Sequence, residues 1–369
     1  MKTKKIALVG NSALTMLNFR LGVMTELSKT YDVTMITPKD CDTAILAKRG
    51  IHFIPIDVDC KGLNPFRDLN LVHVLNRIYR QEHFDFVFHY TIKPIIYGSF
   101  VAGKAGIPFI SIVTGLGYSF IRRNWLFHLS RLMHKWALKK ADSVWFLNQD
   151  DCDSFVNWHI VDRDHTHVIH GEGVNTDLFT AKPKMDNVFR FLFCGRMLRS
   201  KGVELYVEAA RRLKHEYPEV EFQLLGPLDS PNPDAITPEE IETWIKEGYV
   251  SYLGVTKDVR PYLEKCSCMV LPSYYMEGVP RSLMEAASME RPIITTDSVG
   301  CKEVVEDGVN GFLCVKRNVE SLYQAMHKML SLSEEELNAM GSNGRKLMVA
   351  KFDEKIILQE YVQYLNRSI

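Results

Sequence analysis

Two glutamates eight residues apart, Glu277 and Glu285, lie in the stretch "SYYMEGVPRSLMEAASMERP" at residues 273–292. A carboxylate accepts hydrogen bonds from two hydroxyl groups at once, so it suits a vicinal diol such as that of a ribose or a pyranose. Pro280 favours a helix start, which places Glu277 in the loop before the helix and Glu285 within it. The simpler alternative is an amphipathic helix in which Glu285 pairs with Arg281 and Glu277 only complements the helix dipole.

Two cations lie close together in "FRFLFCGRMLRSKGVELYVEAARRL", which reads as a strand, a short loop and a helix. Gly195 and Arg196 follow the strand, and Lys201 and Gly202 precede the helix. A helix start beside two cations suits a diphosphate. The arginine fork and the movable lysine charge can together follow negative charge onto a leaving group. The alternative is an ordinary solvated loop with basic residues.

The first half of the chain also places polar residues just after its apolar runs. In "FHYTIKP", Lys93 lies beyond a strand end and is a candidate for binding a diphosphate. His89 in the same stretch either faces a ligand or is a hydrogen-bonded core histidine. The candidates on this side are Asn11, Ser12, His89, Lys93, Thr114 and Gly115.

The elements that must position these residues alternate along the chain. Short runs rich in Val, Ile and Phe, such as "KKIALVG" and "FDFVFHY", are separated by segments with helical spacing. Runs of this kind are typical of strands buried on both faces. Alternating strands and helices predict an α/β fold with doubly wound parallel sheets, which bind ligands at the carboxyl ends of their strands.

The length of 369 residues suits two domains, and the alternation stops and restarts once. The turn-rich stretch "THVIHGEGVNTDLFTAKPKMDN" marks the interruption. We therefore predict one Rossmann-like domain at residues 1–170, a linker at 171–187 and a second Rossmann-like domain at 188–351. The last segment, 352–369, reads as an amphipathic helix that can pack on either domain, with a return to the first domain as one arrangement.

The charges balance overall, with 45 Lys and Arg against 45 Asp and Glu, so nothing global suggests nucleic acid. The balance hides an asymmetry, because residues 1–170 carry 21 basic and 15 acidic side chains and the remainder carries 24 and 30. Halves of opposite sign fit two domains facing a shared cleft, or a basic domain on an anionic surface.

The N-terminal stretch "MKTKKIALVGNS" has too short an apolar run for a signal peptide, and no window approaches the roughly 20 apolar residues of a membrane span. The eight cysteines show no C-x-x-C spacing for structural zinc, and several lie in apolar runs where a reduced thiol is a small hydrophobe. These features predict a cytoplasmic protein.

A basic segment at residues 118–140, "YSFIRRNWLFHLSRLMHKWALKK", contains six Lys or Arg and no acid. Its apolar stripe consists of Trp125, Leu129, Leu132 and Trp136, and its basic stripe of Arg131, Lys135 and Lys139. A helix of this composition can lie on an anionic membrane surface. The alternative is a core-facing helix with a basic solvent side.

Several motifs occur in a fixed order: G-R, K-G, L-P-S, E-G-x-P, S-L-M-E-A and "RPIITTDSVGCKEVVEDGVNGFLC". Together they resemble the retaining glycosyltransferase family 4, which has the GT-B fold of two Rossmann-like domains facing a central cleft. "HYTIKPIIYGSFVAGKAGIPFISIVTGLGYSF" resembles the bacterial members that extend polyprenyl-diphosphate-linked sugars in capsule, O-antigen or N-glycan precursor synthesis. The resemblance spans most of the chain. It implies that the first domain binds the acceptor and that the second binds the nucleotide sugar.

The family's E-x7-E pattern carries its donor site. The resemblance implies that Glu277 contacts the transferred sugar, that Glu285 binds the ribose, and that Arg196 and Lys201 hold the diphosphate. Arg196, Lys201 and Glu277 are the implied catalytic residues. The remaining implied donor contacts are Gly195, Gly226, Gly254, Gly278, Val279, Pro280 and Glu285.

Two departures from the family pattern are visible. The family usually reads S-x-x-E-G, whereas the segment from Ser273 to Glu277 is one residue longer, which predicts a displaced loop on the sugar side. Residues 114–118 stand where many relatives carry a histidine near the sugar.

Other cofactor motifs are missing or out of context. No G-x-G-x-x-G opens either half, so a nicotinamide dinucleotide is disfavoured. The D-x-D triplets at 57–59 and 151–153 resemble the metal-binding motif of a different glycosyltransferase fold but do not sit in its context. We expect neither an essential metal ion nor a cofactor.

The sequence therefore predicts a retaining glycosyltransferase that moves an N-acetylhexosamine or a hexose from a UDP-sugar to a polyprenyl-diphosphate-linked saccharide, working peripherally on the inner face of the cell membrane. A nucleotide-sugar epimerase or hydrolase is one alternative. A non-enzymatic, nucleotide-responsive membrane assembly protein is the other.

Overall fold

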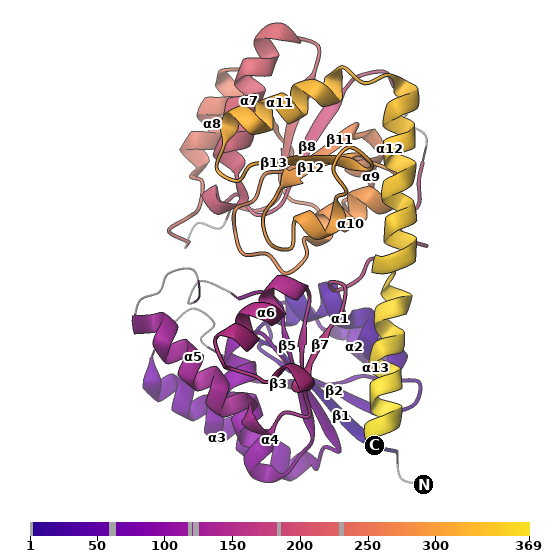
Figure 1. Ribbon diagram of the computed structural model, residues 1–369. Coiled ribbons are helices and arrows are strands. Elements are labelled where there is room, and N and C mark those ends of the chain that lie inside the picture. The colour runs from indigo at the N-terminus through magenta and orange to yellow at the C-terminus, as the bar shows by residue number, and fades with distance from the viewer. Residues whose placement is uncertain (1–2, 59–63, 117–119, 121–124, 183–185, 229–231) are drawn as a thin grey trace. The chain divides into compact units, whose positions relative to one another are not determined.

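The computed structural model describes residues 3–58, 64–116, 120, 125–182, 186–228 and 232–369 (Figure 1). The chain divides into two compact units. The first comprises Met1–Glu172 together with Lys355–Ile369, and the second comprises Gly173–Glu354. Residues 173–187, expected as a linker, thus belong with the second unit, where the Val174 N–H donates to the Phe352 carbonyl at 2.8 Å.

The first domain is built on a seven-stranded sheet in the order β3-β2-β1-β4-β5-β6-β7, and every neighbouring pair is parallel. Its strands are β1 (Lys5–Val9), β2 (Asp32–Thr37), β3 (His52–Pro55), β4 (Phe86–Tyr90), β5 (Phe109–Val113), β6 (Ser143–Phe146) and β7 (Thr166–Val168). The strand order reverses between β1 and β4, and such a switch point is where open α/β sheets bind ligands. β4 is buried along its whole length, as its unbroken apolar run predicts.

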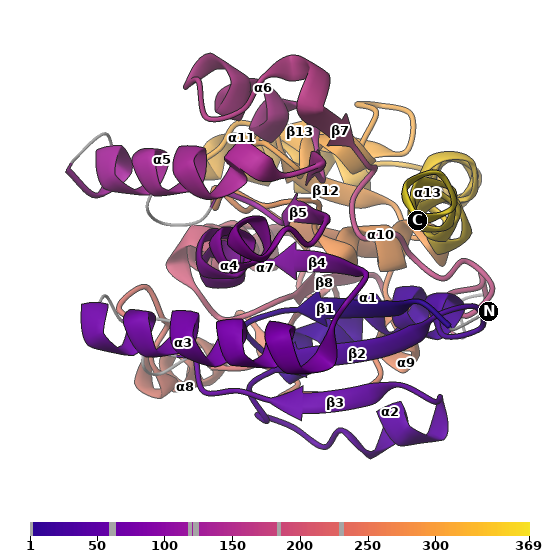
Figure 2. The same cartoon turned by 90° about the horizontal axis from the view of Figure 1, so that it is seen from below.

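Helices cover both faces of this sheet. They are α1 (Ala13–Leu27), α2 (Ala44–Lys48), α3 (Pro65–Glu82), α4 (Ser99–Ala105), α5 (Trp125–Ala137) and α6 (Gln149–Asn157), with the short turns η1 (Pro94–Gly98), η3 (Leu138–Lys140) and η4 (Arg163–His165). Figure 2 shows α3, α4 and α5 side by side on one face. Side-chain caps fix several starts, since Asn64 accepts from the Phe66 N–H and Asn148 from the Asp151 N–H.

The C-terminal helix α13 (Glu354–Ser368) completes the first domain, on the face opposite α3, α4 and α5 (Figure 2). The Tyr90 hydroxyl donates to the Tyr361 hydroxyl at 3.1 Å, and the Tyr361 ring packs 5.0 Å from Trp145 and 5.2 Å from Phe88. These buried contacts account for the apolar stripe of the terminal segment.

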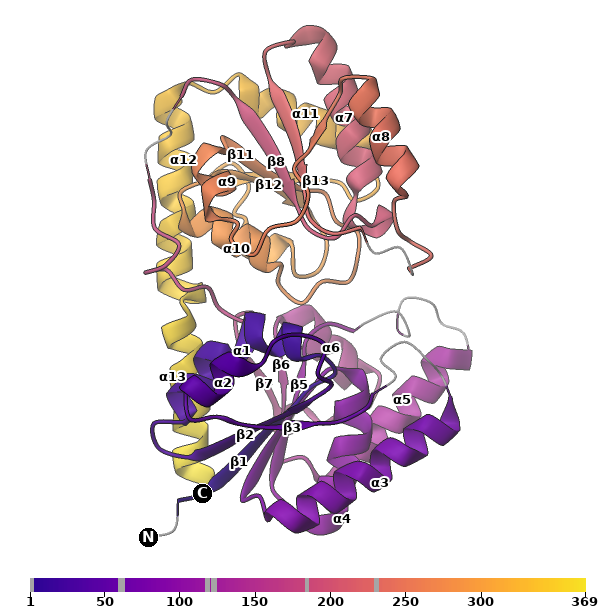
Figure 3. The same cartoon turned by 180° about the vertical axis from the view of Figure 1, so that it is seen from behind.

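The second domain has a six-stranded parallel sheet in the order β10-β9-β8-β11-β12-β13 (Figure 3). Its strands are β8 (Arg190–Cys194), β9 (Glu221–Leu225), β10 (Ser251–Tyr252), β11 (Cys268–Leu271), β12 (Ile293–Thr296) and β13 (Gly311–Cys314). Its helices and helical turns are η5 (Arg199–Lys201), α7 (Val203–Glu216), α8 (Pro238–Lys246), α9 (Arg260–Lys265), α10 (Arg281–Ser288), η6 (Lys302–Val304), α11 (Val319–Leu330), α12 (Glu334–Leu347) and η7 (Met348–Phe352). The predicted pair of parallel α/β domains is confirmed.

Candidate active site

The loop between β8 and α7 is pressed against the carboxyl end of β11. Gly202 caps α7 with φ at 80°, and a Cβ atom there would lie 2.2 Å from the Pro272 carbonyl oxygen. The Ser200 carbonyl accepts from the Tyr274 N–H at 2.9 Å and from the Tyr275 N–H at 3.0 Å. Glycine is required here because a side chain would separate the two loops.

These two loops bring Lys201 and Glu277 together. The Lys201 ammonium donates to a Glu277 carboxylate oxygen, and the Lys201 and Glu277 side chains are only 14% and 10% exposed. The Ser273 hydroxyl donates to the same carboxylate at 2.9 Å, and the Lys201 nitrogen lies 5.7 Å from the centre of the Tyr275 ring. In this position, the Lys201 ammonium can donate to a phosphate oxygen, and the Glu277 carboxylate can accept from a sugar hydroxyl.

The extra residue before Glu277 is accommodated by a tight turn. The Glu277 N–H donates to the Tyr275 carbonyl at 3.0 Å, a bond between residues two apart that shortens the loop. The following residues are held by Gly300, where a Cβ atom would lie 2.2 Å from the Gly278 carbonyl oxygen. Val279 is buried, and Pro280 caps α10 rather than forming its first turn.

Glu285 lies on α10 and bonds to Arg281, whose Nε donates to it at 2.9 Å. This is the i,i+4 pair that the simpler interpretation predicts. The pair does not leave Glu285 as an ordinary surface carboxylate, however, because burial raises the pKa of the Glu285 carboxyl while the Arg281 charge opposes the rise. A largely buried carboxylate of this kind is suited to accept hydrogen bonds from neutral hydroxyls.

Three of the predicted glycines meet at the carboxyl ends of neighbouring strands. A Cβ atom on Gly226, where φ is 143°, would lie 1.9 Å from the Gly195 carbonyl oxygen, and the Gly226 N–H donates to the Gly254 carbonyl at 2.9 Å. Among the described residues, no heavy atom other than those of its chain neighbours lies within 4 Å of a Cβ atom built on Gly254. Arg196 follows Gly195 and is exposed. The predicted donor residues thus share the carboxyl edge of the second sheet.

In the first domain, His89 does not face a ligand. It is completely buried in β4, where its Nε2 bonds to the Tyr79 hydroxyl at 2.8 Å and its Nδ1 to the Ser99 hydroxyl at 3.1 Å. Burial lowers the pKa of His89 to about 3. The acceptor-side prediction for His89 is therefore wrong, because both ring nitrogens are used within the core.

Lys93 lies beyond β4 as predicted, but it is not a lone cation. Its ammonium is 2.6 Å from an Asp68 carboxylate oxygen, and the Tyr97 hydroxyl donates to the other oxygen at 2.7 Å. Thr91, between β4 and Lys93, has φ at 67°, a left-handed conformation that is unusual for a β-branched residue. Sequence spacing does not indicate this contact, because Asp68 lies 25 residues before Lys93, on α3.

The other acceptor-side candidates follow two neighbouring strand regions. Asn11 and Ser12 come after β1, where the Ser12 hydroxyl accepts from the Thr15 N–H at 3.2 Å and so caps α1. Thr114 and Gly115 come after β5, and Gly115 has φ at 129°. Gly117 and Tyr118 lie outside the described residues.

The two aspartates of the 151–153 triplet have different hydrogen-bond partners. Asp153 pairs with Arg163 at 2.6 Å, whereas Asp151 is buried with its Oδ2 accepting from the Asn148 amide at 3.1 Å. Asp59 lies outside the described residues. Within the described ranges, no three His, Cys, Asp or Glu side chains come close enough together to hold a metal ion.

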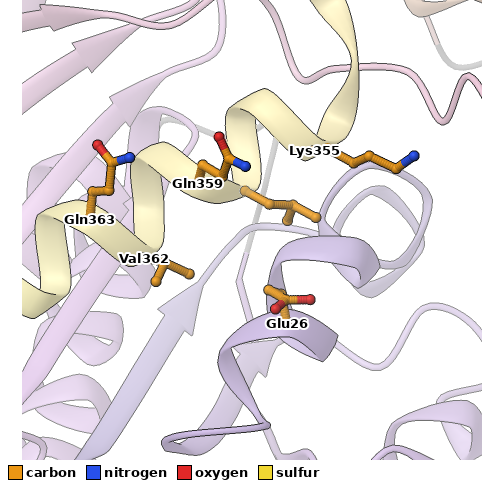
Figure 4. Close-up of a pocket in the computed structure, with 6 residues that line it drawn as sticks. Glu26, Lys355, Gln359, Val362 and Gln363 are labelled. Carbon is orange, nitrogen blue, oxygen red and sulfur yellow. The ribbon is translucent and has the colours of Figure 1, made fainter.

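An open surface pocket of about 340 Å³ lies on the first domain, between α1 and α13 (Figure 4). It is lined by Glu26, Lys355, Leu358, Gln359, Val362 and Gln363. No residue predicted for the donor or the acceptor lines it, so this pocket is separate from the candidate site.

Comparisons with known proteins identify both domains. Residues 5–148 match the model of the glycosyl transferase 4-like family, and residues 188–332 match that of the glycosyl transferases group 1. The chain is 27% identical, over 99% of its own length and 99% of the relative's, to the N,N'-diacetylbacillosaminyl-diphospho-undecaprenol alpha-1,3-N-acetylgalactosaminyltransferase of Campylobacter jejuni. It is 25% identical, over 88% of its length and 86% of the relative's, to the UDP-Gal:alpha-D-GlcNAc-diphosphoundecaprenol alpha-1,3-galactosyltransferase of Escherichia coli.

Solved structures agree on the fold. A glycosyltransferase from Rickettsia africae superposes with a TM-score of 0.78 at 20% identity, covering 100% of this chain and 99% of that one. Anabaena HepE in complex with UDP-glucose superposes with a TM-score of 0.81 at 19% identity, covering 98% and 99%. The chain belongs to the glycosyltransferases that join a 4-like domain to a group 1 domain, and it has the GT-B fold.

Proposed function

We propose that this glycosyltransferase moves an N-acetylhexosamine or a hexose from a UDP-sugar to a polyprenyl-diphosphate-linked saccharide during synthesis of a bacterial surface polysaccharide or glycan. The names of the Campylobacter and Escherichia relatives both specify a diphospho-undecaprenol acceptor, and the latter specifies a UDP-sugar donor. We place the reaction at the cytoplasmic face of the cell membrane, where such an acceptor would be presented.

The observation that carries the proposal is the largely buried Lys201–Glu277 pair at the carboxyl edge of the second sheet, with Glu285 on the adjoining helix α10. Lys201 and Arg196 supply positive charge for a diphosphate. Glu277 supplies acceptor oxygens for the hydroxyls of the transferred sugar, and Glu285 does so for the ribose diol. This set favours transfer over a purely structural role.

We propose that transfer proceeds with retention. The bond between the anomeric carbon and the diphosphate oxygen breaks, and its electron pair leaves with the diphosphate. The acceptor hydroxyl oxygen bonds to the same face of the sugar, and its proton passes to the departing diphosphate oxygen. No enzyme nucleophile is needed, because Lys201 and Arg196 stabilise the departing charge and the protein holds the acceptor hydroxyl on the same face of the sugar as the diphosphate. The proposal includes no metal-dependent step.

The test is a UDP-release assay across a panel of nucleotide sugars, with and without a polyprenyl-diphosphate-linked sugar and with and without EDTA. The expected result is acceptor-dependent, EDTA-resistant release, with the anomeric configuration of the product retained by NMR. Release without acceptor would indicate a hydrolase, and interconversion of donors without release would indicate an epimerase. UDP binding with no turnover on any acceptor would favour the assembly protein.

A further inference from the structure

The outer face of α5 is apolar and uncovered. Trp125, Leu129, Leu132 and Trp136 are 67%, 43%, 65% and 61% exposed. Their spacing of four, three and four residues puts them on one stripe of a helix. The Trp136 ring is held in place, since it stacks on Phe100 with the ring centres 4.3 Å apart.

The opposite face of α5 is the one that packs on the domain. Phe127 and His134 are buried there, and their rings lie 5.7 Å and 5.4 Å from the ring of Phe120. The alternative interpretation, a core-facing helix with a basic solvent side, explains the buried inner face but not the exposed apolar stripe. The outer stripe needs a separate explanation, because a helix satisfied by its domain would expose polar residues there.

A second apolar pair projects from the same helical layer. Phe66 and Leu69, in the first turns of α3, are 82% and 57% exposed. Figure 2 shows α3 and α5 on the same face of the first sheet, with α4 between them. Six of the thirteen large hydrophobic side chains exposed in the described part of the chain therefore lie on these two helices.

The surrounding charge is positive. From Trp125 to Ala137, α5 carries no acid, and Lys135 and Lys139 are exposed. Arg131 is only partly exposed, and its Nε donates to the Trp158 carbonyl at 2.6 Å. On α3, the first-turn acid Asp68 is neutralised by Lys93.

We propose that the outer face of α5, together with Phe66 and Leu69 of α3, docks on an anionic lipid bilayer. Tryptophans among aliphatic side chains enter the interfacial layer, and flanking lysines meet anionic headgroups. A protein partner fits less well, since interface cores are depleted of lysine. Among the described residues no helix is long and apolar enough to cross a bilayer. The inference rests on this surface and not on the sugar chemistry.

The test is co-sedimentation of the full chain with vesicles of phosphatidylcholine alone or mixed with phosphatidylglycerol. We expect binding that requires the anionic lipid and falls at least about tenfold in Trp125→Ser/Leu132→Ser, since each change removes a large apolar side chain from the membrane. The matched control is Ile245→Ser/Val255→Ser, which removes two exposed apolar side chains from the second domain and should leave binding unchanged. Lys135→Gln/Lys139→Gln should lose about fivefold or more at low salt.

A second measurement needs no variant. Fluorescence of the wild-type protein should be quenched by lipids brominated near the headgroup end of the acyl chain, because Trp125 and Trp136 would lie at the boundary between headgroups and acyl chains. Absence of quenching, or equal binding by the Trp125→Ser/Leu132→Ser variant and wild type, would overturn the proposal. So would a dimer in sedimentation velocity that this variant dissociates, because a second copy would then cover the face. None of these readouts depends on sugar transfer, so they can fail while the proposed function stands.

Discussion

At the scale of single residues, the proposed chemistry centres on a cation and an anion that already neutralise each other. Lys201 and Glu277 pair in a largely buried position, and the Ser273 hydroxyl donates to the carboxylate. An incoming diphosphate would compete with Glu277 for the ammonium, which frees Glu277 to accept from sugar hydroxyls. Donor binding and the arrangement of the sugar-side carboxylate are then linked through one lysine.

Lys201→Ala should remove about 2 to 4 kcal/mol of transition-state stabilisation, mostly from kcat, by analogy with loss of one oxyanion-hole donor. Steady-state kinetics with donor and acceptor measure it. The control is the same change in a Glu277→Gln background, which tests whether the loss arises only because Glu277 is left buried and unpaired. If the double variant had the same kcat as Glu277→Gln alone, a direct role for Lys201 would be contradicted. Arg196→Ala should show a loss of the same order.

Glu285→Ala should weaken UDP binding by about 1.5 to 3 kcal/mol, the range for hydrogen bonds to charged groups. Isothermal titration with UDP measures it, and Arg281→Ala is the matched variant, because it breaks the same i,i+4 pair from the other side. If Glu285 served only the helix, both variants would lower stability by a few tenths of a kcal/mol and leave UDP affinity unchanged.

At the scale of elements, the site depends on how closely two loops approach. The β8–α7 loop contacts the end of β11 through Gly202 and through the Ser200 carbonyl, and this contact brings Lys201 to Glu277. The strand-end glycines work in the same way, because Gly226 lets the β9 end approach Gly195. Side chains at these positions would separate the elements that carry the cation and the carboxylate.

Gly202→Ala should lower the free energy of unfolding by about 1 to 3 kcal/mol more than Gly248→Ala, because overpacking adds to the cost of a left-handed alanine. The two glycines have φ at 80° and 77°. The Cβ added at Gly202 would lie 2.2 Å from a backbone oxygen, whereas the Cβ added at Gly248 has no atom of the described residues within 4 Å apart from its chain neighbours. Urea unfolding compares them. Equal losses would show that the loops are not in the close contact described, and UDP affinity should fall only in Gly202→Ala.

At the scale of the whole molecule, the chain crosses from one domain to the other twice, after Glu172 and after Glu354. The returning helix α13 packs its Tyr361 against β4 and β6 of the first domain. The first domain therefore contains both ends of the chain, and the C-terminal helix contributes buried side chains to it. It also contains buried titratable groups that make its stability depend on pH.

Below neutral pH, the first domain should lose stability. Burial lowers the pKa of His89 to about 3 and that of His134 to about 4, so between about pH 6.5 and 4 the unfolded chain binds protons that the folded one does not. Asp151 acts in the opposite direction, because burial raises its pKa to about 7 and its folded form keeps a proton that the unfolded form releases. For these three groups, the two histidines outweigh the one aspartate. The free energy of unfolding should therefore fall by up to about 1.4 kcal/mol for each pH unit as pH falls.

Urea unfolding at pH 7 and pH 5 measures this loss. Asp151→Asn should steepen it, because the variant removes the opposing group, and His134→Gln should flatten it. The opposite order of the two variants would contradict the assignment.

The sequence alone determined the two parallel sheets, the family and the placement of the charged residues after strands. These follow from local patterns: strands buried on both faces need continuous apolar runs, and ligand-binding residues follow strand ends. The short strand β7, Thr166–Val168, was missed because three residues give no pattern. The sequence predicts the apolar stripe of α5, but it does not predict that the stripe is exposed. Periodicity alone does not indicate which face of a helix packs against the domain.

Only the tertiary structure decided what each polar group contacts. His89 is a core residue because Tyr79 and Ser99, each ten residues away, bond to its ring. Lys93 pairs with Asp68, which lies on another helix. Glu277 met Lys201 across 76 residues of sequence. Pairings of this kind depend on how separate strands and helices pack. The spacing of residues along the sequence does not indicate that packing.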